Sequence, residues 1–327
     1  LRQDYQIIRA LSKYLKNEGI EILHTHGVKA AFLGQIAAFL AGTPRVIHTF
    51  HNLIYDRPYP FWKKWIYIWA NRFLHLRADG IIAVSFALKK QLIKVEKIPE
   101  SKIKVIYNGL SPHRFMPLVD VKRKKKSLQL EDGKPVIGVV ARLVPEKGVD
   151  LFLDCIDLIA KQRKGTQFLI IGDGPQRPLL EQKCRQLNLG QKLQMLGFRR
   201  DVAEILPILN VVVIPSRSEG LSITALEAMA CRRPIVAFAA GALPELIHPC
   251  KTGILVPQNQ IQALAQAVLF LLDNPKIAER LGKNACEFVQ AHFSLEKMIR
   301  ETELNYLEIF KGKTKKEQEI RFDLVTD

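Results

Sequence analysis

The sequence predicts an α/β protein of two domains, each built on a mainly parallel sheet flanked by helices. The chain has 327 residues, which is long for one domain. Apolar β-branched runs alternate with helix-period segments along it, the pattern that favours parallel sheets covered by helices. One stretch, residues 112–134, breaks this alternation with prolines and the basic run Lys122–Lys126. We therefore expect two domains joined near this stretch.

Strands and helices of the first half are predicted from short apolar runs and amphipathic segments. The expected strands are residues 20–24, 45–49, 80–84 and 103–107, and the expected helices are residues 4–17, 29–41 and 61–76. The chain starts without Met inside a helix-like segment, and this half supplies about four strands where the second supplies about six. We therefore expect an N-terminal domain that is incomplete at its start.

The second half repeats the alternation more regularly. The expected strands are residues 136–140, 167–171, 193–196, 211–215, 234–238 and 253–256, followed by helices at 261–272, 275–292 and 295–310. The resulting division is an N-terminal Rossmann-like domain over 1–115, a solvated basic linker over 116–134 and a C-terminal domain over 135–294. Residues 295–327 are expected to form a helix that returns toward the N-terminal domain, with a charged tail.

Charge and cysteine content narrow the classes of function. Residues 1–127 hold 23 Lys and Arg against 8 Asp and Glu, whereas residues 128–327 hold 26 against 24. No zinc finger, RNP motif or helix-turn-helix accompanies the basic half, so we expect an anionic membrane or a phosphate-bearing substrate, and no nucleic acid. The five cysteines are scattered without a CxxC pair, which predicts reduced thiols in the cytoplasm and no metal site.

Two glutamates separated by seven residues follow an expected strand. Glu219 lies in the strand-to-helix turn and Glu227 about two helical turns further on, roughly 10–12 Å away at 1.5 Å per residue. That distance matches a sugar and a ribose joined by a pyrophosphate, whose phosphates the helix start would favour. Alone, this spacing fits two surface glutamates equally well.

A cationic segment closes the first strand of the same expected domain, at the same edge of the sheet. Arg142 can form a bidentate contact with a phosphate, and Lys147 adds a second charge. No Asp-x-Asp pair is present to hold a divalent ion. The two cations would therefore stabilise a nucleoside diphosphate leaving group without a metal.

These motifs resemble those of the retaining family 4 glycosyltransferases. The family's Glu-x7-Glu motif after a Gly-Arg-Leu-x-x-x-Lys-Gly segment matches residues 219–227 and 141–148. Further matching segments are residues 170–175, 196–198, 215–220, 226–231 and 244–245, and in the first half 49–51, 83–85 and 108–110. The resemblance extends to about residue 310 and implies the GT-B fold, with two facing Rossmann-like domains that place the acceptor on the N-terminal side and the donor on the C-terminal side.

The resemblance implies a role for each matching residue. Arg142 and Lys147 would bind the diphosphate, Glu219 the sugar hydroxyls and Glu227 the ribose. The remaining donor contacts would come from Gly220, Leu221, Ser222, Gly197, Phe198, Gly172 and Asn108. His51 would lie near the sugar and the acceptor, or be an ordinary loop histidine, while His24 and His26 are interpreted as structural.

The implied reaction moves a sugar from a UDP- or GDP-sugar to a glycan or lipid-linked acceptor, in polysaccharide or glycolipid synthesis. It would proceed with retention and without a cofactor or metal, in the cytoplasm or peripherally on the inner face of the cell membrane. A catalytically silent nucleotide-sugar-binding protein or a GT-B epimerase is the alternative; a phosphorylase would need a longer chain. The chain departs from the family with Ala141, Arg232 and Ala242 where glycines are usual.

All three tryptophans lie in one expected helix. Trp62, Trp65 and Trp69 recur at helical spacing beside Lys63 and Lys64, so they share a face. Aromatic rings with flanking cations are typical of a segment at a membrane interface. A buried tryptophan face within the core is the competing interpretation.

Overall fold

The computed structural model describes residues 2–52, 77–111, 119–190 and 192–323, together with residues 62, 65, 69 and 72. Side chains are described as far as Lys311, except those of Arg2 and Val28. The chain divides into two compact units, one formed by Leu1–Tyr107 with Glu296–Asp327 and the other by Asn108–Leu295. We call them unit 1 and unit 2 and describe each by itself.

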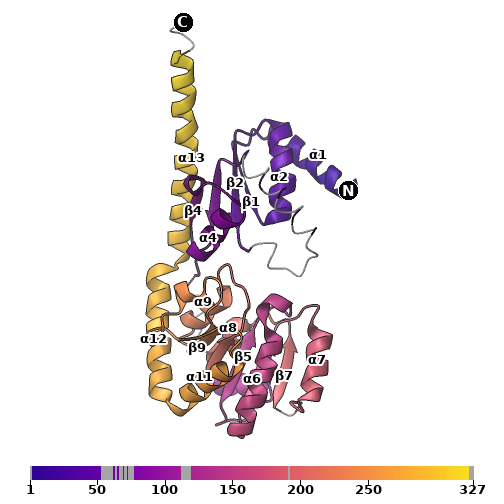
Figure 1. The fold of residues 1–327 in the computed structure, drawn as a ribbon, viewed down its shortest axis with the longest axis vertical. Helices are drawn as coiled ribbons and strands as arrows, with labels where there is room; N and C mark the ends of the chain where they lie inside the picture. Colours follow the sequence, from indigo (N-terminus) through magenta and orange to yellow (C-terminus); the bar gives the residue numbers. More distant parts are fainter. Residues whose placement is uncertain are drawn as a thin grey trace. The chain divides into compact units, whose positions relative to one another are not determined.

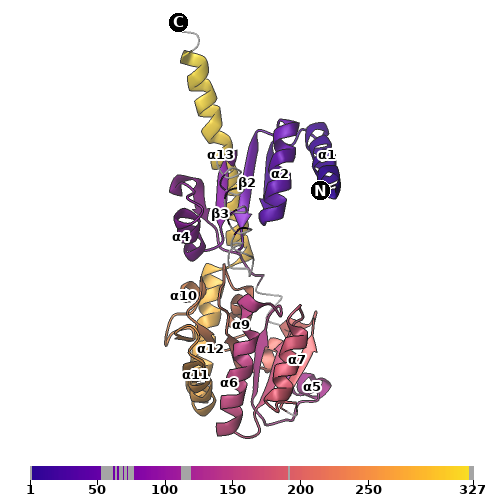
Figure 2. The ribbon, with the colours of Figure 1, turned by 45° about the vertical axis from the view of Figure 1, so that its right-hand side comes forward.

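Unit 1 contains a parallel four-stranded sheet in the order β1-β2-β3-β4. Its strands are β1 (Ile22–His26), β2 (Arg45–Phe50), β3 (Gly80–Ala83) and β4 (Ile103–Val105). Its helices are α1 (Arg2–Asn17), α2 (Val28–Ala41), α4 (Phe86–Lys94) and the larger part of α13 (Leu295–Asp323). Figures 1 and 2 show α13 running along one face of this sheet.

Helices cover both faces of the first sheet because its strands alternate buried side chains between them. Val46 packs with residues of α1 and α2, whereas the next residue, Ile47, packs on the other face with Met298 and Ile309 of α13. This two-sided burial is typical of parallel sheets and explains the continuous apolar runs that predicted these strands. The C-terminal helix is therefore part of the core of unit 1.

Unit 2 contains a parallel six-stranded sheet in the order β10-β9-β8-β5-β6-β7. The strands are β5 (Val136–Val140), β6 (Gln167–Ile171), β7 (Leu193–Gly197), β8 (Val211–Ile214), β9 (Ile235–Phe238) and β10 (Ile254–Val256). The helices are α5 (Val121–Ser127), α6 (Val149–Gln162), α7 (Arg177–Gln186), α8 (Val202–Ile205), α9 (Ile223–Ala230), α10 (Leu243–Leu246), α11 (Ile261–Asp273) and α12 (Pro275–His292). The strand order reverses direction between β5 and β8, which makes this pair the topological switch point of the sheet.

A large apolar core lies between the second sheet and its helices. Ile137 and Val139 of β5 pack in one cluster with Phe152 of α6 and Leu264 of α11. Figure 2 shows α6 and α7 side by side over the sheet of unit 2. On the other face, α9 packs against α12. The carboxyl ends of β5 and β8 are thus held at one edge by a rigid scaffold.

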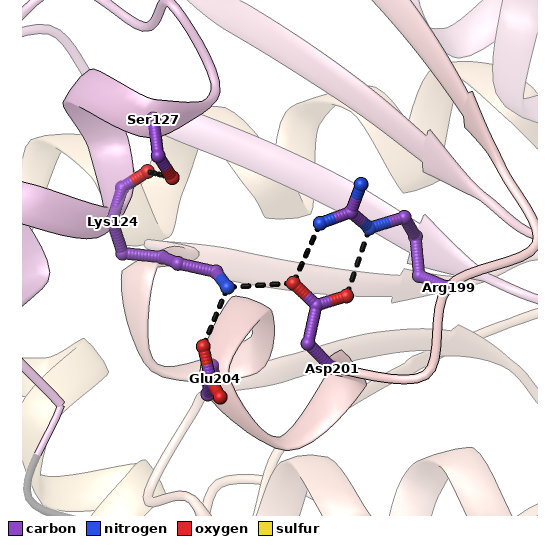
Figure 3. Close-up of polar contacts among 5 residues, drawn as sticks. All are labelled: Lys124, Ser127, Arg199, Asp201 and Glu204. Atoms are coloured by element: carbon purple, nitrogen blue, oxygen red, sulfur yellow. Dashed lines mark hydrogen bonds and ion pairs between the residues drawn. The ribbon is translucent and has the colours of Figure 1, made fainter.

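The basic stretch predicted as a linker is largely part of unit 2, which corrects that interpretation for residues 119–134. Asp120 caps α5 by accepting a hydrogen bond from the amide of Arg123 at 3.0 Å, and Leu128 and Leu130 are buried after it. Figure 3 shows Lys124 between two carboxylates, with Nζ 2.6 Å from both Asp201 and Glu204. Arg199 also pairs with Asp201, and these contacts hold the pKa of the Asp201 carboxyl well below its usual range. The partners lie about 80 residues away, so local composition did not indicate them.

Most of the other predicted strands and helices agree with the structure of the described residues. Every predicted strand is present, with bounds that differ by at most two residues, and α12 spans the predicted 275–292. The last helix is longer than the predicted 295–310 and continues to Asp323. The predicted helix at 61–76 and residues 112–118 fall mostly outside the described residues. Of the helices in the described part of the chain, none is both long and apolar enough to cross a membrane.

The three tryptophans are helical and exposed, with exposed fractions of 60%, 44% and 62% for Trp62, Trp65 and Trp69. The Arg72 guanidinium lies 5.5 Å from the centre of the Trp69 ring, within cation–π range. The interpretation of these residues as a core face is therefore wrong.

Candidate active site

The candidate site lies at the carboxyl ends of β5 and β8, where the strand order of the second sheet reverses. After β5, the chain turns through a single 3₁₀ turn, Pro145–Lys147, and enters α6. After β8, it runs through residues 215–222 into α9. Ligands of α/β proteins bind in the crevice beyond such strand ends. The two segments that carry the predicted charges are therefore brought together by the topology.

Lys147 and Glu219 form the central contact of this site. Lys147 Nζ donates to both carboxylate oxygens of Glu219 at 2.8 Å, and the Ser216 hydroxyl donates to Oε1 at 2.7 Å. Glu219 is only 6% exposed. A buried carboxylate needs such partners to stay ionised at low cost. The ammonium group and the hydroxyl therefore fix the position of the charged carboxylate.

Close backbone contacts lock the two segments together. A Cβ atom on Gly148 would lie 2.0 Å from the carbonyl oxygen of Pro215, and Gly148 has a φ of +62°. Only glycine meets both conditions at low cost. On the far side of Glu219, the Ala242 amide donates to the Glu219 carbonyl at 3.0 Å. The Lys147–Glu219 geometry is therefore supported by the backbone as well as by the charges.

Arg217 and Asp150 form a second bridge that the sequence did not predict. The guanidinium donates through both Nη atoms to the Asp150 carboxylate at 2.7 Å and through Nη1 to the Pro145 carbonyl at 2.9 Å. The Arg217 side chain holds the pKa of Asp150 below its usual value against the effect of burial, which raises it. Arg217 lies inside one of the segments that carry the family resemblance, and that was the only signal for it. Through its contact with the Pro145 carbonyl, Arg217 stabilises the turn that contains Lys147.

Arg142 stands apart from this network and remains accessible. It follows β5 directly, its side chain is 65% exposed, and its nearest carboxylate contact is Glu146 at 3.9 Å. A bidentate guanidinium contact can therefore still form with a phosphate at this strand end. The structure brings Arg142 to the same edge as Lys147 and Glu219.

Helix α9 places the second glutamate of the motif. Ser222 caps the helix by accepting a hydrogen bond from the Ala225 amide at 3.3 Å, and Gly220 and Leu221 are buried before it. Glu227 lies in the second turn, on the same helix, and is half-buried. The first-turn amides of a helix lack partners within it. They add a partial positive charge next to Glu219.

The other predicted donor residues lie at neighbouring strand ends or at the start of the unit. Gly172 follows β6 and donates its amide to the carbonyl of Gly197, at the end of β7, at 2.8 Å. Phe198 follows Gly197 and is 74% exposed, so its ring is available for stacking. Asn108 is the first residue of unit 2 and is half-buried.

His51 belongs to a group of histidines at the carboxyl ends of β1 and β2 in unit 1. His51 Nε2 lies 3.1 Å from His26 Nδ1, and His24 pairs through Nδ1 with the Tyr306 hydroxyl at 2.5 Å and through Nε2 with Thr49 Oγ1 at 2.7 Å. His26 thus contacts the predicted site histidine directly. This pairing was not predicted from the sequence, because it depends on the register of β1 and β2.

Burial keeps the imidazoles of His24, His48 and His51 neutral at pH 7. It lowers the pKa of His24 to about 4, with smaller effects from His26, His48 and His51. It also lowers the pKa of His48 to about 4 and, together with His26, that of His51 below its ordinary value. The rings therefore act as hydrogen-bond donors and acceptors near neutral pH.

Two family models together match most of the chain. The model described as Glycosyl transferases group 1 matches residues 120–288, and the model described as Glycosyltransferase Family 4 matches residues 1–114. The first covers about half of the chain by itself. The first-half match ends at residue 114 and the second-half match begins at residue 120, close to the start of unit 2 at Asn108.

Known proteins with similar sequences or structures support the same assignment. An Escherichia coli UDP-Gal:alpha-D-GlcNAc-diphosphoundecaprenol alpha-1,3-galactosyltransferase is 29% identical over 96% of this chain and 82% of its own. The Anabaena protein HepE, solved in complex with UDP-glucose, has a TM-score of 0.84 at 22% identity, covering 92% of this chain and 82% of its own. A sucrose-phosphate synthase of Thermosynechococcus elongatus has a TM-score of 0.83 at 27% identity, covering 93% and 77%.

Sequence, fold and family matches therefore agree with the motifs at the ends of β5 and β8. The chain belongs to the group 1 glycosyl transferases, glycosyltransferase family 4, and has the GT-B fold of two parallel-sheet α/β domains.

Proposed function

We propose that this protein is a retaining glycosyltransferase that moves a sugar from a nucleotide-diphosphate sugar to a glycan or lipid-linked acceptor. The observation that carries the proposal is the contact of Lys147 with the buried Glu219 at 2.8 Å, together with the exposed Arg142, at the switch point of unit 2. This site combines a fixed carboxylate, which accepts hydrogen bonds from hydroxyls, with cations that can bind a negatively charged diphosphate. A nucleotide sugar carries both kinds of group.

Each charged group has a separate task in this proposal. Arg142 and Lys147 stabilise the diphosphate as negative charge develops on it, the role that fixed cations play in leaving-group departure. Glu219 orients sugar hydroxyls with the backbone amides of Leu221 and Ser222, and Glu227 binds the ribose hydroxyls. Lys147 also holds the Glu219 carboxylate in place, because two of its contacts go to that group.

The stereochemical outcome is part of the proposal. Retention through a covalent intermediate would need a carboxylate nucleophile close to the anomeric carbon. Glu219 is tied to Lys147 and Ser216 through its oxygens, which favours an orienting role. We therefore propose attack of the acceptor on the face from which the diphosphate leaves, with the departing phosphate accepting the acceptor's proton. His51 would hydrogen-bond in its neutral form near the sugar.

A UDP-sugar is the preferred donor, with a GDP-sugar as the second choice. HepE was solved with UDP-glucose, and the Escherichia coli relative is named for UDP-Gal and a diphosphoundecaprenol acceptor. Both names fit a diphosphate at Arg142 and Lys147. From this acceptor class we propose a role in cell-surface polysaccharide or glycolipid synthesis, in the cytoplasm at the inner face of the membrane.

Donor binding is expected to need no divalent metal, because Arg142 and Lys147 supply the positive charge. The test is calorimetric titration of the full chain with UDP-, GDP- and ADP-sugars, with and without EDTA. We expect a UDP- or GDP-sugar to bind with the same affinity in both buffers. A large loss of affinity on chelation, restored by Mg²⁺ or Mn²⁺, would contradict the metal-free proposal.

Access to a lipid-linked acceptor is explained if unit 1 binds an anionic membrane. Its tryptophans Trp62, Trp65 and Trp69 are exposed, and residues 1–107 hold 17 Lys and Arg against 7 Asp and Glu. Exposed aromatic rings favour the headgroup region, and each cation near an anionic leaflet contributes about 1 kcal/mol. We therefore expect peripheral binding through these tryptophans.

Co-sedimentation with vesicles that contain anionic lipid measures this binding. We expect the protein to bind at low salt, to dissociate as salt rises and to bind several-fold more weakly when Trp62 and Trp65 are both changed to Ser. Phe270→Ser is the matched control, because Phe270 is also an exposed aromatic residue of a helix but lies on α11. Vesicle binding that the tryptophan changes leave intact, or no binding at low salt, would refute the docking proposal.

A further inference from the structure

A basic concavity lies at the opposite edge of the second sheet from the candidate active site. It is lined by Pro135, Asn210 and Pro234, the residues that immediately precede β5, β8 and β9. The candidate site lies where β5 and β8 end, and strands of four or five residues separate the two edges by roughly 15 Å. The concavity is therefore a different place on unit 2.

The concavity is large enough for a small molecule and is strongly cationic. Its volume is about 720 Å³, within the range of ligand pockets. The charged side chains that line it are Lys125, Lys134, Arg163, Arg232, Arg233 and Lys283, against Asp132 and Glu279. Lys134 pairs with Glu131 and Arg163 with Asp273. Clustered cations of this kind focus a positive potential inside a concave surface.

Four of these cations have no carboxylate within ion-pair distance among the residues that the structure describes. They are Lys125, Arg232, Arg233 and Lys283. Arg233 is half-buried and donates to the carbonyls of Cys231 and Leu209 at 3.1 and 3.4 Å. Burial lowers the pKa of its guanidinium, and no carboxylate among the described residues lies close enough to act as its counter-ion. An anion in the concavity would supply that counter-ion.

Arg232 occupies a backbone position that favours glycine. Its φ is +55°, in the left-handed region, where a side chain is strained. A glycine is usual there in the family pattern described above, so this chain has a cation in place of the unstrained residue. The backbone of Arg232 also packs tightly on α12, since a Cβ atom on Gly282 would lie 2.2 Å from the Arg232 carbonyl oxygen. This contact sets Arg232 beside Lys283.

We propose that the basic concavity binds a small anion with two or more phosphate groups, at a site separate from the donor site. Arg232, Arg233 and Lys283 contact the phosphates, and Lys125, from the basic run of α5, adds charge at the wall. Side chains of Leu271, Leu272, Pro275 and Ala278 form an apolar part of the lining. That surface would accommodate the organic part of a nucleotide, whereas inorganic polyphosphate would use the cations alone.

Calorimetric titration of the full chain with inorganic tripolyphosphate, and in a second arm with ATP, tests this proposal. The key variant is Arg232→Gly with Lys283→Gln, because glycine suits the φ of residue 232 and the fold should be retained. We expect saturable binding of tripolyphosphate that weakens with salt and falls at least tenfold in the double variant. Tighter binding of ATP than of tripolyphosphate would identify a nucleotide as the ligand class, and equal binding a free polyphosphate.

Two controls separate this site from the donor site. Arg142→Ala should leave tripolyphosphate affinity at the concavity unchanged, and Lys122→Gln, a cation of α5 that does not line the concavity, should change it less than twofold. A thermal melt checks that Arg232→Gly with Lys283→Gln melts no lower than the parent chain. Absence of saturable binding at low salt, or binding that Arg142→Ala removes and the double variant leaves intact, would overturn the proposal.

Discussion

Replacing Lys147 by alanine is expected to lower both the stability of unit 2 and the transfer activity. Among the described residues, the change leaves the buried Glu219 carboxylate with the Ser216 hydroxyl as its one side-chain partner. Removing one partner of a buried ion pair costs about 3–5 kcal/mol, and we expect the lower end because Lys147 is 19% exposed. The value of kcat/KM should fall about 100-fold or more, because a cation at the leaving group and the orientation of Glu219 are lost together. Denaturant unfolding and initial rates measure the two effects.

A double-mutant cycle separates the loss of charge from the loss of packing. Lys147→Met with Glu219→Leu removes both charges, so it should recover much of the stability and none of the activity. The matched control is Lys161→Ala, which breaks an exposed pair with Asp157 at 2.6 Å and should cost less than about 1 kcal/mol. If Lys147→Ala were as stable as Lys161→Ala, the interpretation of a buried, mutually dependent pair would be wrong.

Replacing Arg142 by alanine should have the opposite profile, with donor affinity lost and stability kept. Its side chain is 65% exposed, and its one carboxylate contact among the described residues is with Glu146, at 3.9 Å, so little of the fold depends on it. A charge-assisted contact to a phosphate contributes about 1–3 kcal/mol, which corresponds to an affinity loss of up to about 100-fold. Calorimetry with UDP or GDP in EDTA measures this loss, and circular dichroism melts check the fold.

Arg185→Ala provides the comparison for Arg142→Ala. Arg185 is an exposed arginine in the last turn of α7, outside the candidate site, and its removal should leave nucleotide affinity unchanged. If the parent chain, Arg142→Ala and Arg185→Ala bind the nucleotide with equal affinity, Arg142 does not contact the phosphates. A fall in melting temperature with Arg142→Ala would instead assign it a structural role.

Much of the fold could be predicted because buried parallel strands leave a strong local pattern. Runs such as residues 136–140 and 211–214 are apolar throughout, as strands covered on both faces must be. The prediction of a linker for the basic stretch was wrong because it used local composition alone. The structure of α5 depends on Lys124 meeting Asp201 and Glu204, partners that no local pattern reveals.

The sequence predicted that the residues of the candidate site lie at one edge of the sheet, but it did not predict their contacts with one another. Arg142, Lys147, Glu219 and Glu227 follow from the motifs and from the rule that parallel strands end at one edge. The direct pairing of Lys147 with Glu219, the Arg217–Asp150 bridge and the His26–His51 contact are long-range. They depend on strand register and loop geometry, which spacing alone does not encode.

The central claim is that the groups at the ends of β5 and β8 transfer a sugar from a nucleotide diphosphate with retention. The most direct measurement is transfer by the full chain in EDTA, from α-linked UDP- and GDP-sugars to polyprenyl-diphosphate-linked sugar acceptors. The anomeric configuration of the product is then read by NMR. We predict an α-linked product whose formation is lost with Glu219→Gln. A β-linked product, or a chain that binds the donor and transfers its sugar to no acceptor, would contradict the account.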